Sequence, residues 1–183
     1  MRLPHKLVAI DIETTGLFPE AGADIIQIGA VIVNEDLSMG EQFSSYVKPT
    51  SEYRDAKAMA INSISEEVLA TAPSLEEVMA KLWEFATRGA HPTQPTLAAW
   101  GPTFDVVFIQ SVCRKQGIEL RYNFRPIDLK TIAWWELSRR GDSSNGVTGY
   151  LKKVGLEFEG PKHDALSDIV NTVRLVQAFV PRV

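Results

Sequence analysis

The order of apolar and polar positions predicts three strands in the first third of the chain. Residues 7–13 form a short run rich in β-branched side chains, residues 25–33 form a longer run, and residues 42–47 alternate. Turn-forming residues separate these runs, at 15–22 and 34–40. Connections of this length favour antiparallel neighbours, so we expect the three strands to form a meander.

Helical and strand patterns alternate in the next part of the chain. Ser74 and Glu77 match a capping box, and apolar residues follow at helical spacing, which predicts a helix there. Residues 96–100 are predicted as a short apolar strand. The next helix is expected over 103–116, where Gly117 ends it.

The last strand is predicted over 124–129, at an edge of the sheet, because Pro126 cannot donate a ladder hydrogen bond. A loop is expected over 140–146, followed by helices over 147–154 and 165–180. The fold class is therefore α/β, with a mixed five-stranded sheet flanked by helices, in which the first three strands are antiparallel.

Length and composition narrow the class of protein. The chain has 183 residues, of which 45% are hydrophobic, and this suits one soluble domain over 1–183. Apolar runs such as 7–10 stop after four residues, whereas a membrane span needs roughly 18 to 20. No secretory segment is recognisable, so we expect a cytoplasmic protein. The one cysteine, Cys113, excludes a disulfide within the chain and lies in an apolar helical pattern that predicts packing.

Charge is unevenly distributed along the chain. The net charge of −4 argues against a broad basic surface for nucleic acid. Residues 1–90 hold seven Lys and Arg against 14 Asp and Glu, whereas residues 91–183 hold 12 against nine. We therefore expect an anionic ligand to contact mainly the second half.

Asp11 and Glu13 stand at the end of the first predicted strand. Alternate side chains of a strand share a face, so the two carboxylates point the same way. Like charges this close raise each other's pKa unless a cation stands between them. The alternative is a solvated strand end with two unrelated acids.

Two further clusters hold acids at the start of predicted helices. Asp105, after Phe104, follows the strand over 96–100, at the edge of the sheet where α/β proteins form their sites. Taken alone, Asp105 is explained as an acid that complements the helix dipole. Asp168 falls in the first turns of the last helix, and His163 precedes that helix on a loop that lets it swing. The alternative for this cluster is an N-cap at Asp164 with solvent-facing neighbours.

Together the three clusters resemble the DEDDh exonucleases, the DnaQ-like family that includes proofreading subunits, RNase T and oligoribonuclease. The resemblance covers residues 7 to about 179. It rests on Asp-x-Glu-Thr-Thr-Gly at 11–16, Phe-Asp at 104–105 and His-x-Ala-x-x-Asp at 163–168, with weaker similarity at 60–69 and at Asp128-Leu129. The histidine in the last motif is similar to the histidine subclass, and the family implies a ribonuclease H-like fold with two divalent metals.

The resemblance assigns Asp11, Glu13, Asp105 and Asp168 as metal ligands. Four carboxylates without cysteine suit hard cations, so we expect two ions of Mg²⁺ or Mn²⁺. Two such ions, roughly 3.5 to 4 Å apart, can clamp a scissile phosphate, activate water and stabilise the leaving 3′ oxygen. His163 is then expected to be the general base.

For the terminal nucleotide, the resemblance implies a pocket lined by Thr14, Thr15 and Leu17, with Leu17 against a base. The alternative for Thr14 and Thr15 is a simple β-turn exit.

Without the four ligands, 19 positive and 19 negative side chains remain, so the rest of the chain is neutral. We therefore expect the substrate to be held mainly by metals and local contacts, which favours short strands.

Aromatic residues and one departure bear on nucleotide binding. Trp134, Trp135 and Tyr150 offer candidate stacking surfaces for single-stranded bases, although core packing is the alternative for one or more of them. Family members often carry His-Asn before the Phe-Asp motif, where this chain has Trp100-Gly101. This departure leaves the details of nucleotide binding open, but not the metal site.

These features predict a metal-dependent 3′–5′ exonuclease that releases nucleoside 5′-monophosphates from single-stranded DNA or RNA. Its expected partners are single-stranded 3′ ends and, for a proofreading module, a separate polymerase or repair chain; a homo-oligomer is compatible with the sequence. One alternative is a non-catalytic module that grips a nucleic-acid end or a partner. Another is an internally cutting enzyme of the ribonuclease H type, which would also attack a circular substrate.

Overall fold

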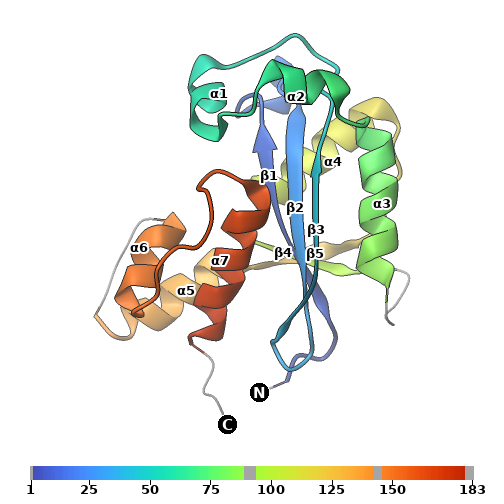
Figure 1. The fold of residues 1–183 in the computed structure, drawn as a ribbon. Helices are drawn as coiled ribbons and strands as arrows, with labels where there is room; N and C mark the ends of the chain where they lie inside the picture. Colours follow the sequence, from blue (N-terminus) through green and yellow to red (C-terminus); the bar gives the residue numbers. More distant parts are fainter. Residues whose placement is uncertain (1, 89–93, 142–145, 180–183) are drawn as a thin grey trace.

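The computed structural model describes residues 2–88, 94–141 and 146–179, which fold around a mixed five-stranded sheet (Figure 1). The strands are β1 (Leu7–Thr14), β2 (Ile25–Val33), β3 (Met39–Tyr46), β4 (Thr96–Ala99) and β5 (Asn123–Asp128). Their order across the sheet is β3-β2-β1-β4-β5. The first three pair antiparallel, as predicted, and β5 lies at the edge that Pro126 indicated.

Three of the strands run in the same direction. β4 pairs parallel with β1, and β5 pairs parallel with β4. The carboxyl ends of these strands therefore meet at one edge of the sheet, which is where α/β folds build their sites.

Seven α-helices are described. They are α1 (Ala56–Asn62), α2 (Glu66–Thr71), α3 (Leu75–Thr87), α4 (Asp105–Gln116), α5 (Leu129–Ser138), α6 (Gly146–Lys153) and α7 (Ala165–Gln177), with a short 3-10 helix at Pro19–Ala21. Among the described residues, none of these helices is both long and apolar enough to cross a membrane.

Most helices match the sequence predictions, including the capping box of Ser74 and Glu77 at the start of α3. The short helices α1 and α2 were not predicted, because each depends on one N-cap, from Asp55 and from Ser65, and is too short for a periodic apolar face. β3 begins three residues before the predicted strand, at Met39. α7 ends at Gln177, with Ala178 as its C-cap, before the predicted end at residue 180. Residue 180 itself and 142–145 of the predicted loop lie outside the described residues.

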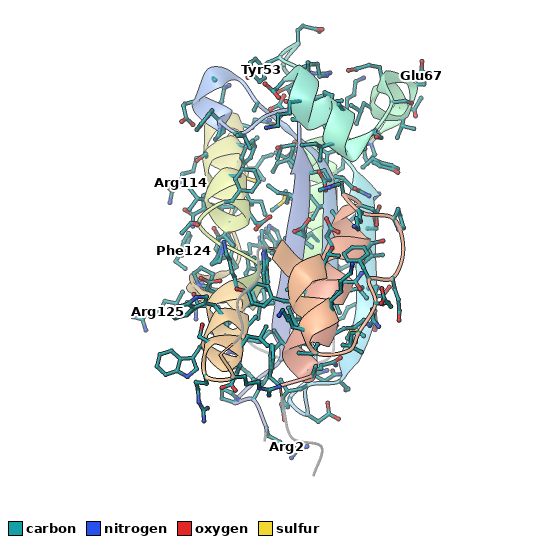
Figure 2. All side chains as sticks on the ribbon, turned by 90° about the vertical axis from the view of Figure 1, so that its left-hand side faces the viewer. Arg2, Tyr53, Glu67, Arg114, Phe124 and Arg125 are labelled. Carbon is teal, nitrogen blue, oxygen red and sulfur yellow. The ribbon has the colours of Figure 1, made fainter. Side chains whose placement is uncertain are left out.

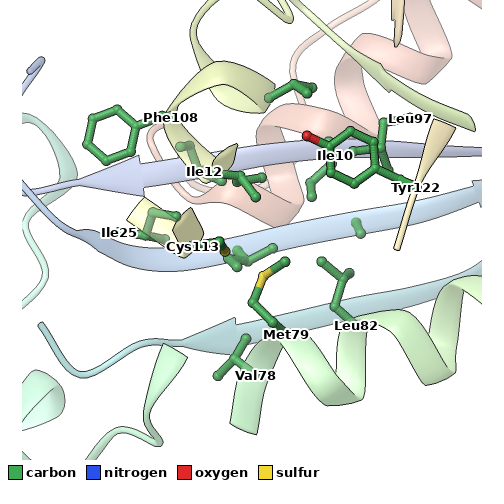
Figure 3. Packing of buried hydrophobic residues seen from close by; sticks show 14 of the residues in the cluster. Ile10, Ile12, Ile25, Val78, Met79, Leu82, Leu97, Phe108, Cys113 and Tyr122 are labelled. Carbon is green, nitrogen blue, oxygen red and sulfur yellow. The ribbon is translucent and has the colours of Figure 1, made fainter. Parts of the chain in front are cut away.

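α3 and α4 cover one face of the sheet. Even-numbered residues of β1, such as Ile10 and Ile12, pack there against Met79 of α3 and Phe108 of α4 (Figure 3). Cys113 is fully buried in the same cluster, which confirms its predicted packing role. Asp11 and Glu13 occupy the alternating positions and therefore face the other side of the sheet.

α5 and α7 cover the opposite face, and α6 packs behind them (Figure 1). Ala9 of β1 packs there against Ile169 and Val173 of α7. Tyr150 is 2% exposed in the cluster between α5, α6 and α7, so core packing is the correct explanation for that ring. Trp134 and Trp135 remain 52% and 59% exposed.

Candidate active site

β1 brings Asp11 and Glu13 to the α7 side of the sheet, opposite Gly29 and Gln27 of β2. Burial, reinforced by the neighbouring acids, raises the pKa of Asp11 well above its usual range. Burial is also the main cause that raises the pKa of Glu13 to about 8, followed by repulsion from Asp168 and Asp105. The backbone pairing of β1 thus holds two carboxyl groups where their charged forms are disfavoured.

Asp105 is the first residue of α4, which follows the β4 strand across a tight turn. It is 6% exposed, and this burial raises its pKa to about 7, against hydrogen bonds with the backbone of Asp105 and Ile12 that lower it. A carboxyl group that is buried here without a neighbouring cation is costly. Asp105 therefore needs a neighbouring cation to hold its negative charge, as Asp11 and Glu13 do.

The start of α7 contributes Asp168 and the preceding His163. Asp164 is the N-cap and accepts a hydrogen bond from the Ser167 amide (2.9 Å), so the N-cap that we considered as an alternative is present in addition to the acidic cluster. Burial raises the pKa of Asp168, although His163 partly opposes this. Ligand atoms of Glu13, His163 and Asp168 lie within 4.8 Å of one another.

All four predicted carboxylate ligands open onto one cleft of about 380 Å³. Its lining residues are Asp11, Ile12, Glu13, Trp100, Gly101, Thr103, Phe104, Asp105, Lys130 and Asp168. The donor set consists of oxygen atoms, and the mutual repulsion of the acids is relieved when divalent cations stand between them. The residues therefore fit hard divalent metal ions.

Gln27 of β2 holds the motif at 163–168 against the sheet. The sequence analysis did not predict this role of Gln27. Its Nε2 donates to Asp164 Oδ2 (2.7 Å), and its Oε1 accepts from the Ala165 amide (3.1 Å). Gly29, on the same face of β2, allows this approach, because a Cβ there would overlap the backbone of Ala165. The available signal was that Gln27 is the polar side chain within the apolar run of β2.

The predicted nucleotide-pocket residues differ in their accessibility. The Thr14 hydroxyl donates to the Gly16 carbonyl (2.7 Å), and the Thr15 hydroxyl accepts from the Asp24 amide (2.9 Å); both threonines are buried. These hydroxyl groups stabilise the turn, as the β-turn alternative describes. Leu17 is 63% exposed. A nucleotide-binding role for the three residues stays a prediction.

Two further cleft residues were not among the predicted site residues. Lys130 is the second residue of α5, and Oδ1 of the N-cap Asp128 accepts hydrogen bonds from the amides of Lys130 (3.0 Å) and Thr131 (3.2 Å). Trp100 stands where the family often carries histidine, and its ring packs edge-on against Tyr150 at 5.5 Å between centroids. The cleft thus combines the acids with one described cation and an aromatic wall.

Comparison with known proteins agrees with this arrangement. A family model described as exonuclease, of the RNase T type, matches residues 8–176. A DNA polymerase III subunit epsilon-like protein of Rhodobacter capsulatus is 32% identical over 176 residues, which are 95% of this chain and 23% of that protein. The 3′-5′ exonuclease DinG of Bacillus subtilis is 30% identical over 167 residues, which are 90% of this chain and 16% of that protein.

A solved structure matches over most of its length. The nuclease domain of 3′hExo, a DEDDh family member bound to rAMP, superposes with a TM-score of 0.75 at 20% identity and covers 93% of this chain and 88% of that chain. At this identity the likeness shows the fold, and it confirms the expected ribonuclease H-like architecture. The chain spans less than a quarter of the length of either curated relative.

Proposed function

The chain belongs to the DEDDh 3′–5′ exonucleases of the ribonuclease H-like superfamily, and from this membership we propose that it removes nucleotides from the 3′ end of single-stranded DNA or RNA. The observation that supports this most directly is the single cleft of about 380 Å³ onto which acids from β1, α4 and α7 open. The expected products are nucleoside 5′-monophosphates.

Asp11, Glu13, Asp105 and Asp168 would hold two divalent ions, Mg²⁺ or Mn²⁺. When bound, such a pair activates a water molecule and stabilises charge on the leaving 3′ oxygen. The carboxyl groups must lose their protons to act as ligands, so their raised pKa values make metal loading depend on pH. The positions of the acids on β1 and α4 would determine where the ions bind and, through them, where the scissile phosphate would lie.

His163 would be the general base. Its exposed side chain, on a backbone with φ 58°, lies beside Glu13 and Asp168 at the rim of the site. The ring would take a proton from the attacking water as the new P–O bond forms and the bond between phosphorus and the 3′ oxygen breaks, and the leaving 3′ oxygen would receive a proton from solvent. Histidine suits this exchange, since it titrates near neutrality.

The expected partners follow from the same site. Single-stranded 3′ ends are the proposed substrates, and a separate polymerase or repair chain is a proposed partner, in line with the epsilon-like relative. A cytoplasmic location and a homo-oligomer stay predictions from the sequence. A non-catalytic module on this fold is disfavoured because all five site residues are present.

The decisive experiment follows 5′-labelled DNA and RNA strands, and a circular single strand, in the presence of Mg²⁺ or Mn²⁺. We expect the linear strands to shorten stepwise from the 3′ end and the circle to stay intact. The control is Asp11→Asn protein, purified in parallel. Cleavage of the circle would indicate the internally cutting alternative, and binding without shortening of any strand would indicate the non-catalytic module.

A further inference from the structure

The first turn of α5 brings a positive charge to the acidic cleft. Lys130 is the cation among the described lining residues, and the N-cap Asp128 holds its backbone in place. Two divalent ions would balance the four carboxylates, but a substrate strand carries further phosphates on its 5′ side. These phosphates need a cationic partner near the cleft.

The helix has two flanks that face different cavities. Leu129, Ala133 and Leu137 are buried and define its inner side. Lys130 lines the acidic cleft, whereas Ile132 lines a separate apolar cavity of about 400 Å³. The acidic cleft therefore meets α5 at Lys130, on a different side of the helix from Ile132.

Trp134 lies on the cleft flank, one turn after Lys130. Residues four apart on a helix are neighbours, about 5 to 6 Å apart at Cβ. Trp135 points about 100° further around the helix, away from Lys130. Trp134 is thus the large aromatic side chain that continues from the Lys130 position along the helix.

The exposure of Trp134 points to a ligand of stated chemistry. The residue is 52% exposed, although tryptophan is usually well buried. A cation followed by an exposed aromatic ring is the combination that single-stranded nucleic acid uses, with phosphates on the cation and bases stacked on the ring. A strand emerging from the cleft carries both groups.

We propose that Lys130 and Trp134 form a second binding position for the substrate strand, in which Lys130 contacts a phosphate 5′ of the scissile bond and Trp134 stacks on a base. The proposal rests on the proposed function and adds a binding position outside the metal site. It predicts that strands long enough to reach Trp134 bind better than a dinucleotide does.

Kinetics on two substrate lengths test the proposal. Trp134→Ala should raise the ratio of KM for a 12-nucleotide strand to KM for a dinucleotide by roughly 5- to 150-fold, the loss of one stacked base. Lys130→Ala should raise the same ratio and lower the slope of log KM against log salt by about 0.7, the loss of one phosphate contact.

Two matched controls lie on α5 and β5 but away from the cleft. Trp135→Ala removes a similarly exposed tryptophan from another side of α5. Arg125→Ala removes the cation labelled in Figure 2, which is among the residues that line the apolar cavity. Both should leave the length ratio at the wild-type value. Equal effects of Trp134→Ala and Trp135→Ala, or none from Trp134→Ala, would overturn the proposal and leave this face to a protein partner.

A binding measurement separates this inference from the proposed function. Fluorescence anisotropy of a labelled 12-nucleotide strand on the Asp11→Asn protein reads the same contact without turnover. Adding Trp134→Ala to that protein should weaken binding, and adding Trp135→Ala should not. If wild type degrades strands but neither assay responds to Trp134→Ala, this inference alone fails. If wild type is inactive yet Trp134→Ala weakens binding, the proposed exonuclease activity is contradicted and the binding position is supported.

Discussion

β1 and the start of α7 contribute acids to the same cleft, but the two regions hold them in different ways. The β1 strand pairs with β4 only up to Ala9 but with β2 along its length, so the ladder with β2 places Asp11 opposite Gly29. The α7 motif begins on a turn where His163 has φ 58°, and Gln27 and Ser167 hold its N-cap Asp164 through hydrogen bonds.

Burial raises the pKa of Asp168 on α7 as it raises those of the β1 acids, but the N-cap Asp164 differs from them. Burial and neighbouring acids raise the pKa of Glu13 to about 8. Burial also raises the pKa of Asp164, but hydrogen bonds from Ser167 and Gln27 outweigh it and leave that pKa below its usual range. Substitutions on β1 should therefore act mainly through charge, and substitutions that loosen the α7 motif should act mainly through geometry.

The largest effect is expected from a change of charge on β1. Asp11→Asn should lower kcat by at least roughly 1,000-fold, because a divalent ion contributes several kcal/mol to the transition state. Isothermal titration with Mn²⁺ should show one weakened or missing site. Equal metal affinity in Asp11→Asn and wild type would contradict the ligand assignment.

On the α7 side, His163→Ala removes the proposed base and keeps all four carboxylates. We expect kcat to fall by roughly 100- to 10,000-fold while Mn²⁺ affinity changes little. An unchanged kcat at unchanged Mn²⁺ affinity would contradict the assignment of His163 as the general base.

A change that touches only the support of the α7 motif should have an intermediate effect. Gln27→Ala removes both hydrogen bonds to the start of α7, so we expect a loss of roughly 10- to 100-fold in metal affinity or activity, as for other residues that orient metal ligands. Gln42→Ala, on the exposed strand β3, is the matched control. Equal activity of the two variants would show that Gly29 and the N-cap suffice to place α7.

The smallest effect concerns stability without metal. The pKa of Glu13 rises from 4.5 to about 8 on folding, so the folded protein holds a proton that the unfolded chain loses earlier. Stability without metal should therefore decrease as pH rises from about 4.5 to about 8. Thermal melts in EDTA should show this decrease, and Mg²⁺ or Mn²⁺ should reverse it at pH 8.

Glu13→Gln provides the control for that decrease. The variant should be about 0.5 to 2 kcal/mol more stable than wild type at pH 8 without metal, and it should gain less from added Mn²⁺. A stability that does not change with pH between 5 and 8 would mean that relaxation around the acids removes the cost of their charges.

Local chemistry explains which parts of the fold were predictable. The capping box before α3 and the prolines and glycines at element ends act within a few residues, so the elements they mark were predicted. The short helices α1 and α2 were missed because they lack two turns of apolar periodicity. Trp134 and Tyr150 had been considered for the same role, yet one is exposed and the other buried.

The sequence by itself determined the five strands and the helices with capping or apolar periodicity, the alternation that puts Asp11 and Glu13 on one face, and the motifs that mark the family. Only the tertiary structure decided that Gln27 fixes the start of α7 and that Lys130 lines the same cleft as the acids, because both arrangements join segments far apart in the chain. Local patterns report which way a side chain points relative to its own element. They do not report which other element packs against it.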